Sequence, residues 1–116
     1  MGMKSMFWSS ILLAMTLTVG FALAPAAERT SAAADPRSDY TRKCANCHGR
    51  DGRSKTARGR RTHSRDLTDS SWQDDVSDER LFNSINNGRG KMPGFKKSFS
   101  ENEIEALVGY VRRLRR

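Results

Sequence analysis

The sequence predicts an all-α domain of three to four short helices over residues 35–116. Two stretches, after Ser77 and after Ser100, place apolar residues three and four positions apart and begin with a helix-capping residue. No stretch of any length alternates apolar and polar residues as a half-buried strand would, and no internal repeat is present. The length of 116 residues allows one such domain after an N-terminal segment of different composition.

Residues 1–34 have the pattern of a secretory signal peptide. Lys4 gives a positive start, the run from Phe7 to Ala24 is apolar and uncharged, and small residues follow it. We expect cleavage between residues 26 and 34. Because the apolar run is also just long enough to span a bilayer, an uncleaved membrane anchor is the alternative. The domain is therefore expected in the periplasm, either released or anchored in the membrane and facing the periplasm.

The first half of the domain is predicted to hold one short helix and two irregular segments. The helix covers residues 38–46 and can be capped by Asp35 or Ser38. Residues 49–65 contain three glycines, seven basic residues and no large aliphatic residue, which predicts a loop. Residues 66–72 are rich in turn formers and end at Trp72.

The second half is predicted to hold two amphipathic helices separated by a loop. The first begins after the N-cap Ser77, runs for about three turns and ends at Gly88. Residues 89–97 form the loop. Ser100 and Glu103 then form a capping box at the start of the last helix, which ends among arginines.

The domain has too few apolar side chains for its size. Leu, Ile, Val and Phe account for 12 of residues 35–116, about 15%, below the roughly 20% that combines with high charge in disordered chains. A small domain of this kind needs a disulfide, a metal or another bound group to complete its core. The sequence therefore predicts that something other than side chains fills the interior.

Both cysteines of the chain lie in one motif, Cys44-Ala45-Asn46-Cys47-His48. In an exported protein, C-x-x-C-H predicts covalent haem attachment, with two thioether bonds to the vinyl groups and His48 as an axial iron ligand. A thioredoxin-like motif would need a βαβ setting, and a zinc site would need two further ligands where only His63 remains. A disulfide between residues 44 and 47 closes so small a loop that it would stabilise the fold little.

With these residues, the domain resembles the small class I c-type cytochromes, electron carriers with one covalent haem c per chain. The resemblance covers essentially all of residues 35–116. It implies a cytochrome c-like fold in which Tyr40 and the pair Leu107 and Tyr110 mark the crossing of the first and last helices. It also implies a methionine ligand in the loop before the last helix, where Met92 lies between Lys91 and Pro93.

The predicted metal ligands are thus His48 and Met92, and the predicted haem-binding residues are Cys44, Cys47, His48, Met92 and Trp72. Trp72 either donates its indole N–H to a haem propionate or packs on the porphyrin edge. We interpret His63 as a surface residue of the basic loop rather than a rival ligand. The remaining apolar side chains near the haem are expected to be Leu81, Phe82, Ile85, Phe95, Leu107 and Val111.

Two departures from the family pattern bear on this prediction. Pro36 stands where the family often has a small residue at the helix crossing, which predicts a looser crossing or a later helix start. No proline occurs between Pro36 and Pro93, although the family commonly has one near the carbonyl that orients the proximal histidine. Some carbonyl between Arg53 and Arg65 is expected to orient His48 instead.

The predicted function is exported one-electron transfer by a carrier that is not an enzyme. The alternatives are a haem-based ligand-binding or sensor module with a labile Met92, a membrane-anchored cytochrome subunit of a respiratory complex, and a basic scaffold with a disulfide and no cofactor. From residue 35 onward, 19 basic residues face 12 acidic ones, a net charge of +7, which predicts acidic redox partner proteins. Because the protein is expected to be exported, nucleic acid is not an expected partner. Contact with a membrane, through anionic lipid or an uncleaved leader, is an alternative. We expect the protein to be a monomer.

Overall fold

The computed structural model describes residues 35–116, and the predicted signal peptide or anchor of residues 1–34 lies outside the described residues. Within that range the chain forms six helices and no strand. They are α1 (Pro36–Lys43), α2 (Ala45–His48), α3 (Ala57–Thr62), α4 (Ser70–Asp75), α5 (Asp78–Asn87) and α6 (Glu101–Arg113). The all-α prediction is confirmed, and the additional helices are short segments of four to six residues.

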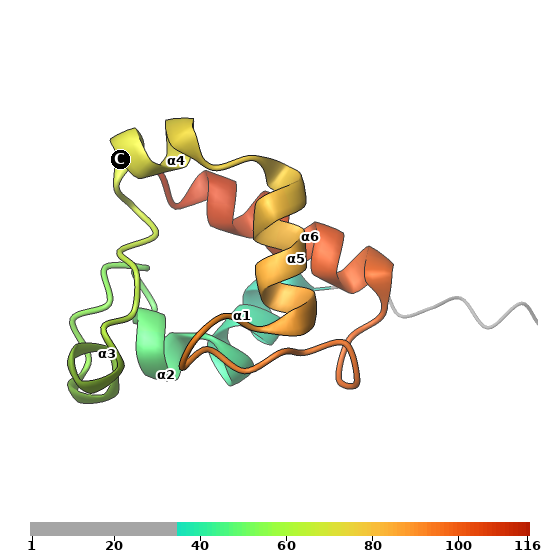
Figure 1. Cartoon of the computed structure of the whole chain (residues 1–116), viewed down its shortest axis with the longest axis horizontal. Coiled ribbons are helices and arrows are strands. Elements are labelled where there is room, and N and C mark those ends of the chain that lie inside the picture. Colours follow the sequence, from blue (N-terminus) through green and yellow to red (C-terminus); the bar gives the residue numbers. More distant parts are fainter. Residues whose placement is uncertain (1–34) are drawn as a thin grey trace, which may run out of the picture.

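The helices α1, α5 and α6 form the apolar centre of the domain. Figure 1 shows α1 and α5 lying against α6, with α2 and α3 side by side at the lower left and α4 at the upper left. Tyr40 of α1 is 1% exposed, and its ring centre lies 4.9 Å from that of Tyr110 on α6. Leu107 and Ile104 of α6 are buried beside it. The expected crossing of the first and last helices is therefore present.

The first helix begins earlier than the sequence predicted and stops sooner. Pro36 occupies the first turn, where a backbone N–H would have no hydrogen-bond partner within the helix, so the missing N–H of proline costs no helical bond. The Asp35 carboxylate accepts from the Arg37 N–H at 3.2 Å. The expectation of a later start because of Pro36 is wrong. The helix is interrupted at Cys44, which ends α1 and begins α2, so two helices replace the single helix predicted over residues 38–46.

The loop predicted over residues 49–65 is also wrong in part, because α3 lies inside it. This helix has no apolar stripe that would reveal it in the sequence. It is instead capped by Thr56, whose side chain accepts from the Gly59 N–H at 2.8 Å, and it packs against α2. Likewise α4 begins within the predicted turns, with Asp69 accepting from the N–H groups of Ser71 and Trp72.

A buried polar network joins α4 to α6. Gln73 is 3% exposed and donates from its side-chain amide to the carbonyls of Leu67 and Val111, both at 2.8 Å. Its side-chain Oε1 accepts from Arg112 at 3.0 Å, and Arg112 also donates to the Asp78 carboxylate at the start of α5 at 2.7 Å. These bonds hold α4 and the first turn of α5 on the last helix.

The predicted ends of α5 and α6 are confirmed. The Ser77 side chain caps α5 and Gly88 ends it, while Ser100 and Glu103 form a capping box at α6. The loop between them contains a single isolated bridge, from Arg89 to Met92.

Candidate functional site

The motif with both cysteines lies at the junction of α1 and α2. The Cys44 N–H still donates to the Tyr40 carbonyl at 2.8 Å, and the His48 N–H donates to the Cys44 carbonyl at 3.0 Å. The two backbone bonds place Cys44, Cys47 and His48 around one helical turn. The turn is also held to α1, because the Tyr40 hydroxyl donates to the Gly49 carbonyl at 2.8 Å.

The two cysteines are half-buried free thiols and form no disulfide. Burial, followed by the neighbouring Asp39 carboxylate, raises the pKa of Cys44 to about 11. Redox-active C-x-x-C cysteines have the opposite property, a lowered pKa that produces a thiolate nucleophile. The environment of Cys44 therefore gives no support to a thioredoxin-like role.

The ring of His48 is oriented by a backbone carbonyl from the far end of the following segment. Its Nδ1 lies 3.0 Å from the carbonyl oxygen of Arg65, so Nδ1 carries the proton and donates to that oxygen. Burial lowers the pKa of His48, and the bond to Arg65 only partly offsets this effect. The imidazole is therefore neutral, with the lone pair of Nε2 available to a metal.

The segment between His48 and Arg65 is tied back onto the motif by bonds that the sequence did not reveal. The Ser54 N–H donates to the His48 carbonyl at 2.8 Å, and the Thr56 hydroxyl donates to the carbonyls of Asn46 and Cys47 at 2.8 and 3.1 Å. The only sequence signal for these contacts is the Thr-x-x spacing before Gly59, which suits an N-cap. Backbone carbonyl acceptors have no side-chain signature at all.

Met92 lies in a loop that is fixed by backbone contacts with the end of α5. Arg89 and Met92 exchange two backbone hydrogen bonds of 2.9 and 3.0 Å, and the Phe95 N–H donates to the Ile85 carbonyl at 2.9 Å. Gly88 has a left-handed φ of 81°, and a Cβ there would lie 2.6 Å from the Met92 carbonyl oxygen. Only glycine permits this close approach, which sets the position of Met92.

The loop of Met92 also reaches the segment that orients His48. The Lys91 ammonium donates to the Arg61 carbonyl at the end of α3, at 3.4 Å. Met92 itself is half-buried and packs against the hydrophobic core. The loop and α3 thus connect the motif to Met92.

Trp72 and His63 lie in different environments. Trp72 is half-buried against the core, and the guanidinium of Arg65 lies 5.7 Å from its ring centre. The tryptophan therefore neighbours the residue whose carbonyl orients His48. His63 is exposed at the end of α3, as expected of a surface residue.

The apolar residues expected near the cofactor divide into two groups. Leu81, Ile85, Leu107 and Val111 are buried within the protein core, whereas Phe82 and Phe95 are only partly buried. Other partly buried side chains that pack on the core are Cys44, Trp72, Met92, Tyr110 and Leu114. Free thiols, a neutral imidazole with one open nitrogen, a thioether and incompletely buried aromatic rings are together the groups that suit a covalent haem.

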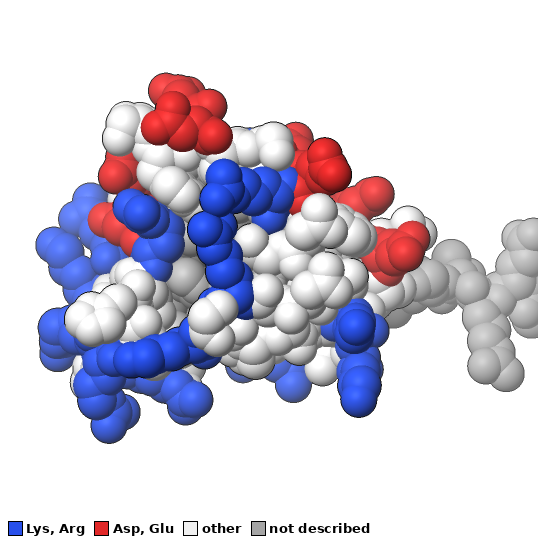
Figure 2. Space-filling view, viewed as in Figure 1, with Lys and Arg blue, Asp and Glu red and all other residues white. Residues whose placement is uncertain are grey.

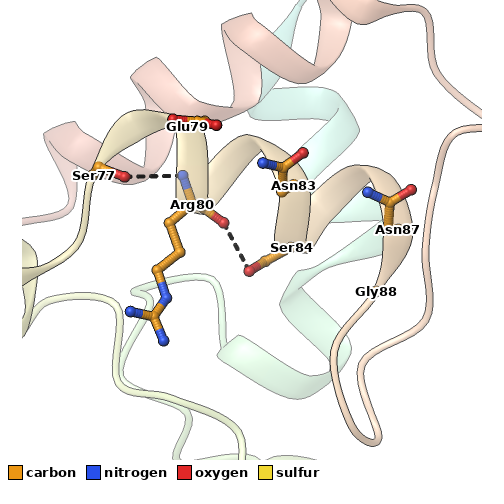
Figure 3. Close-up of a pocket in the computed structure, with 7 residues that line it drawn as sticks. All are labelled: Ser77, Glu79, Arg80, Asn83, Ser84, Asn87 and Gly88. Carbon is orange, nitrogen blue, oxygen red and sulfur yellow. Dashed lines mark hydrogen bonds between the residues drawn. The ribbon is translucent and has the colours of Figure 1, made fainter.

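Two surface pockets of the described domain are lined by residues of α5. One lies along the polar residues of α5, where Figure 3 shows the Arg80 side chain extended from the helix and the Ser84 hydroxyl donating to the Arg80 carbonyl at 2.8 Å. Another lies between α5 and α6, beside Phe82 and Val108. Neither is lined by a residue of the C-x-x-C-H motif or by Met92.

Two kinds of feature are absent from residues 35–116. No three His, Cys, Asp or Glu side chains there are grouped so that they could hold a metal ion. No helix in the same range has the length and apolar content needed to span a bilayer.

Residues 31–111 match the family model described as cytochrome c oxidase, cbb3-type, subunit III. A solved structure titled KustC0563 c-type cytochrome is 36% identical, with a TM-score of 0.67, over 71% of this chain and 99% of that chain. A solved point mutant of Kustc0563, in which phenylalanine replaces a tyrosine, is 35% identical, with a TM-score of 0.65, over 70% of this chain and 99% of that one. Among the curated proteins, none matches.

Proposed function

This chain belongs to the c-type cytochromes and carries covalently bound haem c for electron transfer, and we propose that it is an exported monohaem carrier with His48 and Met92 as the iron ligands. In this proposal Cys44 and Cys47 form the two thioether bonds. Each thiol would add across a vinyl group of the haem, forming one carbon–sulfur bond and giving its proton to the neighbouring vinyl carbon. The step is neither an oxidation nor a reduction overall.

The observation that carries the proposal is the bond from His48 Nδ1 to the Arg65 carbonyl. It holds the imidazole in the tautomer whose Nε2 can bind iron, next to the two free thiols. The position of Met92, in a loop fixed to the end of α5 and joined to α3 through Lys91, supports a thioether as the second ligand. Bound haem would exchange one electron at its iron, and ligation by His48 and Met92 would raise its reduction potential and occupy both axial positions.

The test is expression in a host that matures c-type cytochromes. The wild type is expected to give the pyridine haemochrome spectrum of haem with two thioether bonds and the weak far-red band that thioether ligation gives a ferric haem. Met92→Ala should keep the haem, lose that band and acquire a lower reduction potential and an open site. His63→Ala, which changes an exposed histidine, is the control and should keep the band. A colourless wild-type product would end the proposal of a carrier with His48 and Met92 as iron ligands.

The same spectra distinguish a carrier from a ligand-binding or sensor module. A sensor with a labile Met92 should lack the far-red band at neutral pH and bind carbon monoxide in the ferrous state. The carrier should retain the band and bind carbon monoxide poorly until Met92 is replaced.

Acidic redox partners are proposed to dock on a basic surface formed by α3 and its neighbours. Figure 2 shows Lys and Arg side chains gathered over α3 and the adjoining loops, and Asp and Glu side chains over α4. We define the basic surface as the exposed residues Lys55, Arg58, Arg60, Arg61 and Lys91. Because α3 packs on α2, this surface adjoins the motif that would hold the haem. Charge of this kind accelerates encounter without requiring tight binding.

Small inorganic oxidants can test this steering. Oxidation of the ferrous protein by ferricyanide, an anion, should slow as ionic strength rises, and oxidation by a cationic cobalt complex should speed up. Arg58→Glu should reduce the rate with ferricyanide more than Arg37→Glu, which makes the same change in net charge on α1. Equal effects of the two variants would show that only net charge matters.

The family model describes a subunit of an oxidase, which supports the alternative of a membrane-anchored cytochrome subunit. Intact mass of the exported protein decides between a cleaved and an uncleaved leader and reports the added haem. A mass that includes residues 1–34, with the protein in the membrane fraction, would favour an anchored subunit over a released periplasmic carrier.

A further inference from the structure

The carbonyl oxygen of Arg65 accepts two hydrogen bonds, and only one comes from His48. His48 Nδ1 lies 3.0 Å from this oxygen, and the hydroxyl of Ser54 donates to the same oxygen. The Ser54 hydroxyl oxygen is also 3.4 Å from His48 Nδ1. A carbonyl oxygen has two lone pairs, so it can accept from both donors at once.

Ser54 is held in this position against its backbone preference. Its φ is 57°, a left-handed conformation that glycine adopts freely and serine rarely does. The residue is buried, and its N–H donates to the His48 carbonyl at 2.8 Å. A glycine here would keep that backbone bond without the strain, so the backbone alone does not account for a serine.

The hydroxyl has a physical effect on the iron ligand. Two donors on one oxygen compete, because each draws electron density from the lone pairs that the other uses. The bond that His48 donates is therefore weaker than it would be to a carbonyl that accepts from His48 alone. A stronger bond at Nδ1 makes the imidazole a more basic ligand, which stabilises ferric over ferrous iron.

We propose that Ser54 is a positioning residue that raises the reduction potential of the haem by sharing the Arg65 carbonyl with His48. This rests on the proposed function, in which His48 is an iron ligand. Without the hydroxyl, the Arg65 oxygen is left to His48, the Nδ1–H bond strengthens and the potential falls.

The experiment compares Ser54→Gly and Ser54→Ala with the wild-type holoprotein. Both variants are expected to have a lower reduction potential in spectroelectrochemical titration. In both, the Nδ1–H proton of His48 should move downfield in the NMR spectrum of the ferrous protein. Thr41→Ala is the control, because it removes a hydroxyl that donates to the Arg37 carbonyl at 2.8 Å in α1. The control should change neither quantity.

The two variants separate the hydroxyl from the backbone strain. Ser54→Gly should be at least as stable as the wild type because it relieves φ, whereas Ser54→Ala keeps the strain. A fall in potential of similar size in both supports the shared carbonyl, and changes of opposite sign would overturn it. If Ser54→Ala fails to fold, Ser54→Gly alone decides by its potential and its Nδ1–H shift.

The spectra show which proposal has failed. If the wild type lacks the far-red thioether band, the proposed ligation itself is wrong. If the band is present in the wild type and both variants but the potential is unchanged, only the role of Ser54 is wrong.

Discussion

Gly59 lies where α3 comes close to the Cys47 carbonyl of α2, and Gly59→Ala tests that contact. A Cβ at this position would lie 2.3 Å from the Cys47 carbonyl oxygen and 2.6 Å from the Ser54 carbonyl oxygen. Real Cβ atoms essentially never approach other atoms within 3.0 Å, so α3 must move away from α2 by at least 0.7 Å, the difference between 3.0 and 2.3 Å. Both opposing atoms belong to the backbone and cannot rotate aside.

The expected cost follows from two opposing effects. Overpacking against rigid atoms costs about 1–3 kcal/mol, and the upper part of this range applies because neither partner can yield. Alanine in a helix is more favourable than glycine by about 1 kcal/mol. We therefore expect Gly59→Ala to lower the free energy of unfolding by about 2 kcal/mol, or roughly 8–16 °C in Tm for a domain of this size.

The assay is guanidinium and thermal unfolding of the ferric holoprotein, followed by circular dichroism. Gly109→Ala in α6 is the matched control, because the nearest atom to its Cβ is the Arg113 side chain at an ordinary 3.7 Å. This variant should gain about 0.5–1 kcal/mol from helix propensity alone. The reasoning is refuted if Gly59→Ala is stabilised as much as Gly109→Ala, since the predicted overlap would then have no consequence.

The remaining predictions concern side chains away from the motif. Gln73→Ala leaves the carbonyls of Leu67 and Val111 without their buried donor and should cost about 2–4 kcal/mol in urea unfolding; a loss below about 1 kcal/mol would contradict this. Ser100→Ala removes the N-cap of α6 and should cost about 1 kcal/mol in the same assay, so an unchanged midpoint would count against the cap. Bonds from the backbone N–H and then the hydroxyl of Ser100 lower the pKa of Glu103 below its usual 4.5. The stability it contributes is therefore fully present above pH 4.5 and lost as the pH falls through the lowered value, so the Tm difference between wild type and Glu103→Gln should shrink as the pH is lowered further below 4.5; a constant difference would refute it.

Local sequence signals predicted the two longest helices and the location of the motif. The caps at Ser77 and Ser100 act on N–H groups three positions away, and the apolar stripes of α5 and α6 repeat within one or two turns. Interactions over such short separations are visible in the order of residues. The all-α class followed from these stripes and caps, and the C-x-x-C-H spacing, which is local in the same sense, indicated the family.

The short helices were not predictable, because what stabilises them is distant in sequence. The helix α3 has no apolar face and depends on Thr56 and on its close approach to Cys47. Similarly, α4 depends on Gln73, whose bond to Val111 spans 38 positions. Propensity within a window of residues contains no information about such partners.

From the sequence alone, the chemistry of this domain was determined: two thiols and an imidazole within five residues, and one methionine in a later loop. Only the tertiary structure decided which atom orients the imidazole. That atom is the Arg65 carbonyl, which every residue type would supply equally, and Ser54 reaches it through a backbone conformation that serine does not prefer. The physical reason is that side-chain types are encoded one by one, whereas backbone acceptors become specific only when the fold brings them to a partner.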